Sequence, residues 1–322
     1  MGATNAGINI FAGIPPLIDP PTTGQVFFVG NSTTVVPGGT TGVDAAGAYG
    51  DSPKKPFATL DYALGASTGI TAGRGDTIYV LPGHAETYSA AAALVCDVAG
   101  VNIIGLGSGN NRPTFTFATE VLTDIDIDAA NVKIQGLRFI GNIAALAAPI
   151  DVNAAGFTMR YCDWYCAGAT TDINMTVITD ANADDMVIEF CNFNYIASRA
   201  ATAATVTNTM TEVIRLVGAD RANINNCFMN GNFTTACING VTTASRDIQI
   251  FNNRLHNVQT TNIAGIIDLV ASCDGIISYN SGFHGFVTNI ATVIDPAGCA
   301  MIENYFSNVV TESGGIVGTR ST

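Results

Sequence analysis

The chain has 322 residues, of which 13 are Lys or Arg and 26 are Asp or Glu, so its formal net charge is −13. Charged residues make up 12% of the chain, about half of the roughly 25% found in soluble domains, whereas the apolar share of 48% is ordinary. The apolar content argues against intrinsic disorder, and the acidic balance argues against nucleic acid as a partner, because phosphates would be repelled. No apolar run approaches the roughly 18 to 20 residues of a membrane helix, so no membrane contact is expected.

Residues 1–49 differ from the rest of the chain and are predicted to form an extended arm and a linker. The stretch from Ile8 to Pro21 is apolar and rich in Pro, which favours extended backbone over helix. Residues 26–29 and 33–36 are candidate short strands, and the Gly, Thr and Ala of residues 37–50 are typical of a linker. Residues 1–11 contain no Lys or Arg, so no secretory signal is expected. An apolar arm of this kind docks onto a partner or onto its own body, and the residues expected to do so are Ile8, Ile10, Phe11, Ile14, Leu17 and Ile18.

A short capping helix is predicted within residues 50–65. Pro56 suits the first turn of a helix, and Phe57, Leu60 and Leu64 would then share one face. That apolar face is expected to close the N-terminal end of the domain that follows, where an unpaired strand edge would invite association.

A short pattern recurs through the rest of the chain. An apolar residue is followed at the fourth position by Cys, Asn or Leu and at the sixth position by a large apolar residue. The copies begin at Ile134, Met159, Ile188, Ile224, Ile250, Ile277 and Met301, with offsets of 25, 29, 36, 26, 27 and 24 residues. The segments lack a helical period, and Gly, Asn, Asp and Thr turns separate them, which indicates strands. Strands at this spacing leave no room for crossover helices, so we predict an all-β parallel solenoid of roughly 8–10 coils over residues 50–310, with residues 311–322 as a short tail.

Stacking of the coils would place the fourth residue of every copy in one column. That column is expected to be a structural ladder, in which Asn side chains hydrogen-bond along the stack and satisfy amides that would be costly to bury. Its members are Leu137, Cys162, Cys191, Cys227, Asn253, Asn280 and Asn304. The eight cysteines form no CxxC pair, so free buried thiols are expected rather than a zinc site. An irregular sandwich with coincidental spacing is the alternative.

Two segments carry a resemblance to a known family. Residues 50–65 contain Pro56-Phe-Ala-Thr59, and residues 73–83 contain Gly75-Asp-Thr-Ile-Tyr-Val80 followed by Pro82-Gly83. Together they resemble the opening segment of right-handed parallel β-helix proteins of the pectate-lyase-like superfamily. The resemblance extends over residues 50–310 and implies a right-handed parallel β-helix. It says little about activity, because the architecture is used by lyases, by hydrolases and by inert parts of virus particles.

Residues that could perform catalysis are few. Asp124, Asp126 and Asp128 alternate along one predicted strand face and are the best candidates for a metal site, although a solvated strand face has the same pattern. Asp163 has no acidic neighbour in the next coil, and an Arg160–Glu189 pair is predicted to be a salt bridge between coils. The single Trp, Trp164, falls at a core position, and no groove with exposed aromatic residues is expected. We therefore expect no catalytic residues, no resident metal and no cofactor.

We expect the protein to act in the assembly of a larger particle rather than as an enzyme. The apolar arm, a C-terminal end that is expected to be uncapped, and a repetitive Asn, Thr and Gly surface are similar to those of solenoids in bacteriophage particles. This resemblance implies a non-enzymatic virion protein made in the host cytoplasm, namely a trimeric capsid decoration (cement) protein whose arm binds the major capsid protein or another virion protein. The alternative is a tailspike or receptor-binding β-helix that binds or cleaves bacterial surface polysaccharide. A secreted polysaccharide lyase is a third candidate, disfavoured by the scarcity of Lys.

Overall fold

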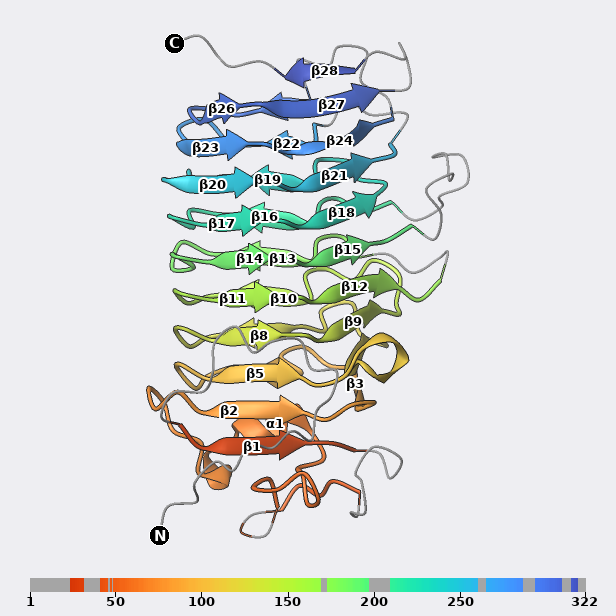
Figure 1. Ribbon diagram of the computed structural model, residues 1–322, viewed down its shortest axis with the longest axis vertical. Coiled ribbons are helices and arrows are strands. Elements are labelled where there is room, and N and C mark those ends of the chain that lie inside the picture. The colour runs from red at the N-terminus through yellow and green to blue at the C-terminus, as the bar shows by residue number, and fades with distance from the viewer. Residues whose placement is uncertain are drawn as a thin grey trace.

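The computed structural model describes residues 24–31, 41–45, 47, 49–168, 173–196, 209–259, 265–285, 293–308 and 314–317. These residues form a solenoid in which each turn contributes one strand to each of three sheets, with β1 at one end and β28 at the other (Figure 1). All strands within the sheets pair in parallel except β28, which confirms the predicted all-β parallel β-helix. Eight turns are complete, running from β2–β3–β4 to β23–β24–β25, and they are numbered here as turns 1 to 8.

The strands form three sheets. Sheet 1 contains β1 (Val26–Val29), β2 (Thr77–Val80), β5 (Asn102–Gly105), β8 (Lys133–Gln135), β11 (Thr158–Arg160), β14 (Val187–Glu189), β17 (Asn223–Asn225), β20 (Ile248–Phe251), β23 (Gly275–Ser278) and β26 (Ala300–Ile302). Sheet 2 contains β3 (Ala85–Tyr88), β6 (Thr114–Phe117), β9 (Arg138–Gly141), β12 (Asp163–Cys166), β15 (Asn192–Asn194), β18 (Phe228–Gly231), β21 (Arg254–Asn257), β24 (Ser281–His284), β27 (Asn304–Asn308) and β28 (Gly314–Val317). Sheet 3 contains β4 (Leu94–Val95), β7 (Ile125–Ile127), β10 (Ile150–Val152), β13 (Val177–Thr179), β16 (Ile214–Leu216), β19 (Ile238–Gly240), β22 (Ile267–Asp268) and β25 (Ile294–Asp295).

Register places like residues above like residues. The first residues of the recurring pattern are paired directly in sheet 1, for example Met159 with Ile134 on one side and with Ile188 on the other. The sixth residues form an internal aromatic stack, in which the Trp164 ring lies 4.4 Å from Phe139 and 6.5 Å from Phe193. Trp164 is fully buried, as its position in the pattern predicts. Because no single turn can bury its own apolar face, this stacking is what supplies a continuous core.

The N-terminal end of the solenoid is closed, but not as the sequence predicts. The helix α1 spans Leu60–Leu64 and begins at an N-cap, Thr59, whose side chain accepts a hydrogen bond from the Tyr62 N–H. Pro56 therefore lies outside the helix, and Phe57 instead forms a parallel bridge with Val29. The expectation that the Pro-Phe-Ala-Thr stretch starts the helix is wrong, because the open edge of β1 captures this backbone as an additional strand-like segment. Two short 3₁₀ helices, η1 (Ala66–Thr68) and η2 (Gly109–Asn111), complete the helical content of the described residues.

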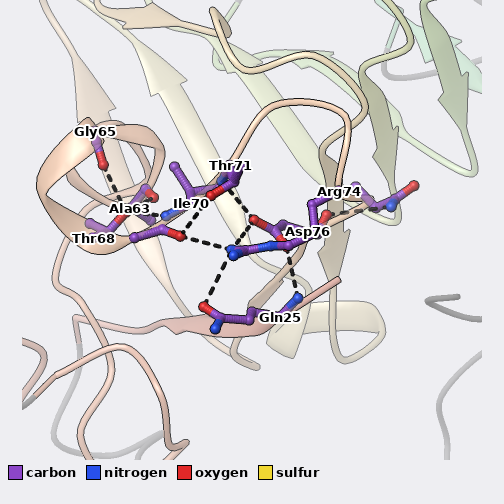
Figure 2. A network of polar contacts seen from close by, with 10 residues as sticks. Gln25, Ala63, Gly65, Thr68, Ile70, Thr71, Arg74 and Asp76 are labelled. Atoms are coloured by element: carbon purple, nitrogen blue, oxygen red, sulfur yellow. Dashed lines mark hydrogen bonds and ion pairs between the residues drawn. The ribbon is translucent and has the colours of Figure 1, made fainter. Parts of the chain in front are cut away.

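A buried carboxylate ties β1 to the first complete turn. The carboxylate of Asp76 accepts hydrogen bonds from the backbone N–H groups of Gln25 and Thr71 and from the Arg74 guanidinium (Figure 2). Burial alone would raise the pKa of Asp76, but these hydrogen bonds outweigh it and hold the pKa below its usual value. Strand β1 lies within the segment assigned to the arm and linker, and it pairs with β2, so that sheet 1 begins at Val26.

The C-terminal end is covered in part. Strand β28 pairs antiparallel with β27 and so covers the last parallel strand of sheet 2. The expectation that residues 311–322 leave this end uncapped is therefore wrong for sheet 2. Among the described residues, β26 and β25 are the last strands of sheets 1 and 3.

Candidate functional site

The predicted ladder lies at the corner between sheets 1 and 2. Each member follows a strand of sheet 1, and the structure places all of them in the interior, between 0 and 2% exposed. In the Asn part of the column, each side chain connects neighbouring turns. Asn280 Oδ1 accepts from the backbone N–H of Asn253 at 3.0 Å, and Asn280 Nδ2 donates to Ile250 O at 2.9 Å and to Asn304 Oδ1 at 3.0 Å. Asn253 makes the same three bonds, and Asn304 accepts from the Asn280 N–H and donates to Ile277 O, so every amide of the column has a protein partner.

The Cys part of the column is bonded more weakly. The Cys227 thiol donates to Ile188 O at 3.6 Å and to Asn225 O at 3.2 Å, and the Cys191 thiol donates to Met159 O at 3.5 Å. Burial raises the pKa of the Cys191 thiol, and the neighbouring thiols of Cys162 and Cys227 raise it further. All eight cysteines are free, and all except Cys166 are buried. The seven buried thiols are therefore packing groups and are poorly suited to act as nucleophiles.

The residue before the ladder position turns the corner in a left-handed conformation. It has a positive φ, between 46° and 72°, in seven consecutive turns. The residues are Gly136, Tyr161, Phe190, Asn226, Asn252, Tyr279 and Glu303. Gly and Asn adopt this conformation readily, whereas a bulky aromatic residue does so at a cost.

Two of these corner aromatics form a surface feature that the sequence analysis missed. The rings of Tyr161 and Phe190 are stacked, with centroids 5.1 Å apart and an interplanar angle of 8°. Phe190 is 44% exposed, and Tyr279 and Tyr305 are 52% and 46% exposed in later turns. Aromatic residues are thus exposed on the surface of the solenoid, although Trp164 lies in the core as predicted. The third position of the repeating pattern, where Tyr and Phe replace Gly and Asn, was the signal that could have shown it.

Acidic residues near the corner are engaged in ion pairs. Arg160 Nε lies 2.5 Å from Glu189 Oε1 of the next turn, which confirms the predicted salt bridge. Asp163 Oδ2 lies 2.5 Å from Arg112 Nη1. The two carboxylates are thus held by guanidinium groups, in the arrangement of a structural pair rather than of a general acid with its base.

The three aspartates that were candidates for a metal site lie on and beside β7 of sheet 3. Asp126 is half-buried on the outer face, Asp124 accepts a hydrogen bond from the Ala92 N–H, and Asp128 accepts one from Asn153 Nδ2 at 3.1 Å. Burial, together with the charges of Asp124, Asp128 and Asp151, raises the pKa of Asp126 to about 6. Among the described residues, no group of three or more His, Cys, Asp or Glu side chains is placed to hold a metal ion.

The histidines are dispersed. His84 is buried, with Nε2 at 3.1 Å from Glu86 Oε2. His256 is paired with Phe283, and His284 with Asn257, so the two histidines of adjacent turns are offset by one residue of register.

The residues predicted to dock the arm, from Ile8 to Ile18, lie outside the described residues. No helix in the described part of the chain is long and apolar enough to cross a membrane.

Comparison with known proteins yields only remote structural similarities. No protein-family profile matches the chain, and no curated protein matches it. Among solved structures, similar ones include a rhamnogalacturonan lyase (12% identity, 81% of this chain and 74% of that chain, TM-score 0.38) and the pectate lyase Pel9A (12% identity, 91% and 79%, TM-score 0.43). A third is the ORF18 protein of Geobacillus virus E2, at 12% identity, with 79% of this chain and 57% of that chain covered and a TM-score of 0.33.

Proposed function

We propose that the protein is a non-enzymatic structural component of a bacteriophage particle, a trimeric capsid decoration protein anchored through its N-terminal arm. Its partners would be further copies of itself and the major capsid protein or another virion protein, and it would lie on the particle surface after synthesis in the host cytoplasm. The observation that carries the proposal is the satisfied Asn ladder from Asn253 to Asn304, which links successive turns and stiffens the solenoid.

The charged side chains support the same role. Three ion pairs connect residues of different turns. They are Arg112–Asp163, Arg160–Glu189 and Arg221–Asp185. Such pairs hold neighbouring turns in register.

The anchor of the arm also supports it. The Asp76 network fixes Gln25, the residue from which the chain leaves β1 towards the arm. A buried carboxylate with several hydrogen bonds resists displacement, because removing its partners would leave an uncompensated charge. A load on the arm would therefore be passed to the body of the solenoid.

The test is attachment to particles that lack the protein. Deletion of residues 2–22 is expected to abolish attachment, and Ile14→Asp with Leu17→Asp should lower it by at least about tenfold, since each buried aliphatic side chain contributes roughly 1.5–3 kcal/mol. Thr22→Ala with Thr23→Ala is the matched control. Circular dichroism and thermal melting would establish that the solenoid is folded in every variant. Full-affinity attachment of the deletion would disprove the anchoring role.

The corner aromatics favour a second candidate function, which is the binding of bacterial surface polysaccharide by a tailspike-type protein. The Tyr161–Phe190 stack exposes the Phe190 ring, adjoins the Arg160–Glu189 pair in sequence, and has both residues in an unfavourable backbone conformation. Rings and planar polar groups in this combination suit the apolar face and hydroxyls of a sugar ring.

This candidate is tested with a panel of bacterial polysaccharides. Phe190→Asn relieves the backbone and removes the ring, so it should abolish binding if the stack is the platform, whereas Tyr279→Asn is the control in a distant turn. Release of unsaturated sugars that is lost with Asp163→Ala would disprove the non-enzymatic proposal.

A further inference from the structure

The outer face of sheet 2 carries cations without a carboxylate partner. Its first outward column runs through Arg138, Asp163, Asn192, Phe228 and Arg254 in turns 3 to 7. Asp163 is bonded to Arg112, but within the described part of the chain Arg138 and Arg254 form no ion pair. Both guanidinium groups are instead positioned over aromatic rings, Arg138 at 5.7 Å from the Tyr165 centroid and Arg254 at 5.4 Å from the Phe228 centroid. We call Arg138, Tyr165, Phe228 and Arg254 the sheet 2 face.

The outer face of sheet 3 has the opposite character. Its central column runs through Asp126, Asp151, Ile178, Arg215, Asn239, Asp268 and Asp295 in turns 2 to 8. Among the described residues, Asp126, Asp151 and Asp268 have no cationic partner within ion-pair distance. Burial raises the pKa of Asp151 and of Asp268, and neighbouring aspartates raise both further, although a hydrogen bond from the Asn153 side chain offsets part of the rise at Asp151. We call Asp126, Asp151, Arg215 and Asp268 the sheet 3 face.

The two faces carry opposite charges at the same level in turns 3 and 7. Arg138 and Asp151 both belong to turn 3, and Arg254 and Asp268 both belong to turn 7. The single cation of the sheet 3 column, Arg215 in turn 5, is already paired with Glu212 and is level with the uncharged Asn192. Turns are about 4.8 Å apart, so two solenoids lying side by side with parallel axes would bring residues of the same turn to the same level. Only 13 of 322 residues are Lys or Arg, which makes two unpaired arginines opposite aspartates of the same turns a specific arrangement.

We propose that the sheet 2 face of one copy docks on the sheet 3 face of a second copy, with parallel axes and level turns. The inference rests on the self-association in the proposed function and assigns its interface. Different patches meet at this contact, so the assembly closes into a ring if the rotation between copies fits, and three copies are the number expected. Arg138 would pair with Asp151, and Arg254 with Asp268, in a contact from which water is partly removed and where charge complementarity fixes partner and register.

The test uses charge reversal in the full-length protein. Arg138→Glu with Arg254→Glu places acids opposite acids, and Asp151→Arg with Asp268→Arg places cations opposite cations. Each double variant is expected to weaken self-association at least about 100-fold, because like charges at an interface cost several kcal/mol. The chain that carries all four substitutions restores opposite charges and should regain most of the affinity. Masses would be measured by sedimentation velocity between about 0.1 and 100 μM.

Lys54→Glu with Lys55→Glu is the matched control, because it makes the same change in net charge at two exposed lysines of the N-terminal cap. It should leave the mass unchanged. Thermal melting monitored by circular dichroism would show that all variants retain the solenoid. A monomeric wild-type protein at 100 μM, double variants with the wild-type mass, or a quadruple variant that stays dissociated would each overturn the proposal. A protein that oligomerises as described but does not attach to particles would overturn the proposed function alone.

Discussion

The same interior column is built in two different ways at the two ends of the solenoid. In turns 4 to 6 it consists of Cys162, Cys191 and Cys227, and further on it consists of Asn253, Asn280 and Asn304. Each Asn accepts a hydrogen bond from the backbone N–H of the column residue one turn earlier, and the donors are Cys227, Asn253 and Asn280. Among the hydrogen bonds of the described residues, none engages the N–H of Cys162 or Cys191. The corner therefore accepts Leu, Cys or Asn as a buried side chain, and only the amide in addition satisfies the backbone.

The largest expected effect comes from removing an amide in the middle of the column. Asn280→Ala would leave the Asn253 N–H and the Ile250 carbonyl without partners, so we expect a loss of about 3 kcal/mol in the free energy of unfolding. Chemical denaturation would measure it. Asn252→Gly is the control, since Asn252 is exposed in a left-handed conformation that Gly also adopts, and it should change stability by less than about 0.5 kcal/mol. Equal effects of the two variants would contradict the role of the ladder.

Removing a thiol from the column should lower the free energy of unfolding by less than removing an amide. Cys191→Ala deletes one buried sulfur and its weak hydrogen bonds, so we expect a loss of about 1 kcal/mol, most of it from the cavity. The same denaturation measurement applies. A loss as large as that of Asn280→Ala would contradict this, because it would mean that the Cys and Asn parts of the column contribute equally to the free energy of unfolding.

Extending the amide column should stabilise the protein. Cys227→Asn would present an acceptor to the Cys191 N–H and a donor to Ile188 O, which the Cys227 thiol now reaches at 3.6 Å. We expect a gain of about 1 kcal/mol, the net value of one added hydrogen bond with little change in volume. Cys237→Asn is a control at a buried thiol outside the column and should be destabilising. A loss of stability in Cys227→Asn would show that turn 6 cannot accommodate the amide.

The last prediction concerns the rate at which the buried thiols react with a reagent in solution. Burial raises the pKa of Cys191, so at pH 8 the fraction of thiolate, the form that reacts, is very low, and reaction with an aromatic disulfide reagent should take hours. Cys166, which is only partly buried, should react within minutes. Mass spectrometry of the labelled peptides would distinguish them. Rapid labelling of Cys191 in the folded protein would contradict the packing of this column.

The sequence predicts this column well because repeats of similar length align like residues, and the six-residue pattern extends over two strands and the corner between them. Features that depend on contacts distant in sequence were not predictable in the same way. Phe57 pairs with Val29 rather than entering a helix, because the edge of β1 is a tertiary feature. His256 and His284 are 28 residues apart, whereas the register from Arg254 to Ser281 spans 27, which moves each histidine beside a different partner. The match between Arg138 and Asp151 was also hidden, because the segments between sheets 2 and 3 vary in length from turn to turn.

The pairing of β28 with β27 determines how unfolding can start from the C-terminal end of the solenoid. Each ladder amide serves the turn before it, so a turn lost from the C-terminal end leaves its predecessor with unpaired backbone groups, and peeling would continue inwards. The antiparallel pairing of β28 with β27 must open before that process can start, and it therefore acts as a latch. At the opposite end, a pull would first meet the charged clamp around Asp76. We therefore expect that a force applied at the N-terminus must be larger to unfold the solenoid than a force applied at the C-terminal end.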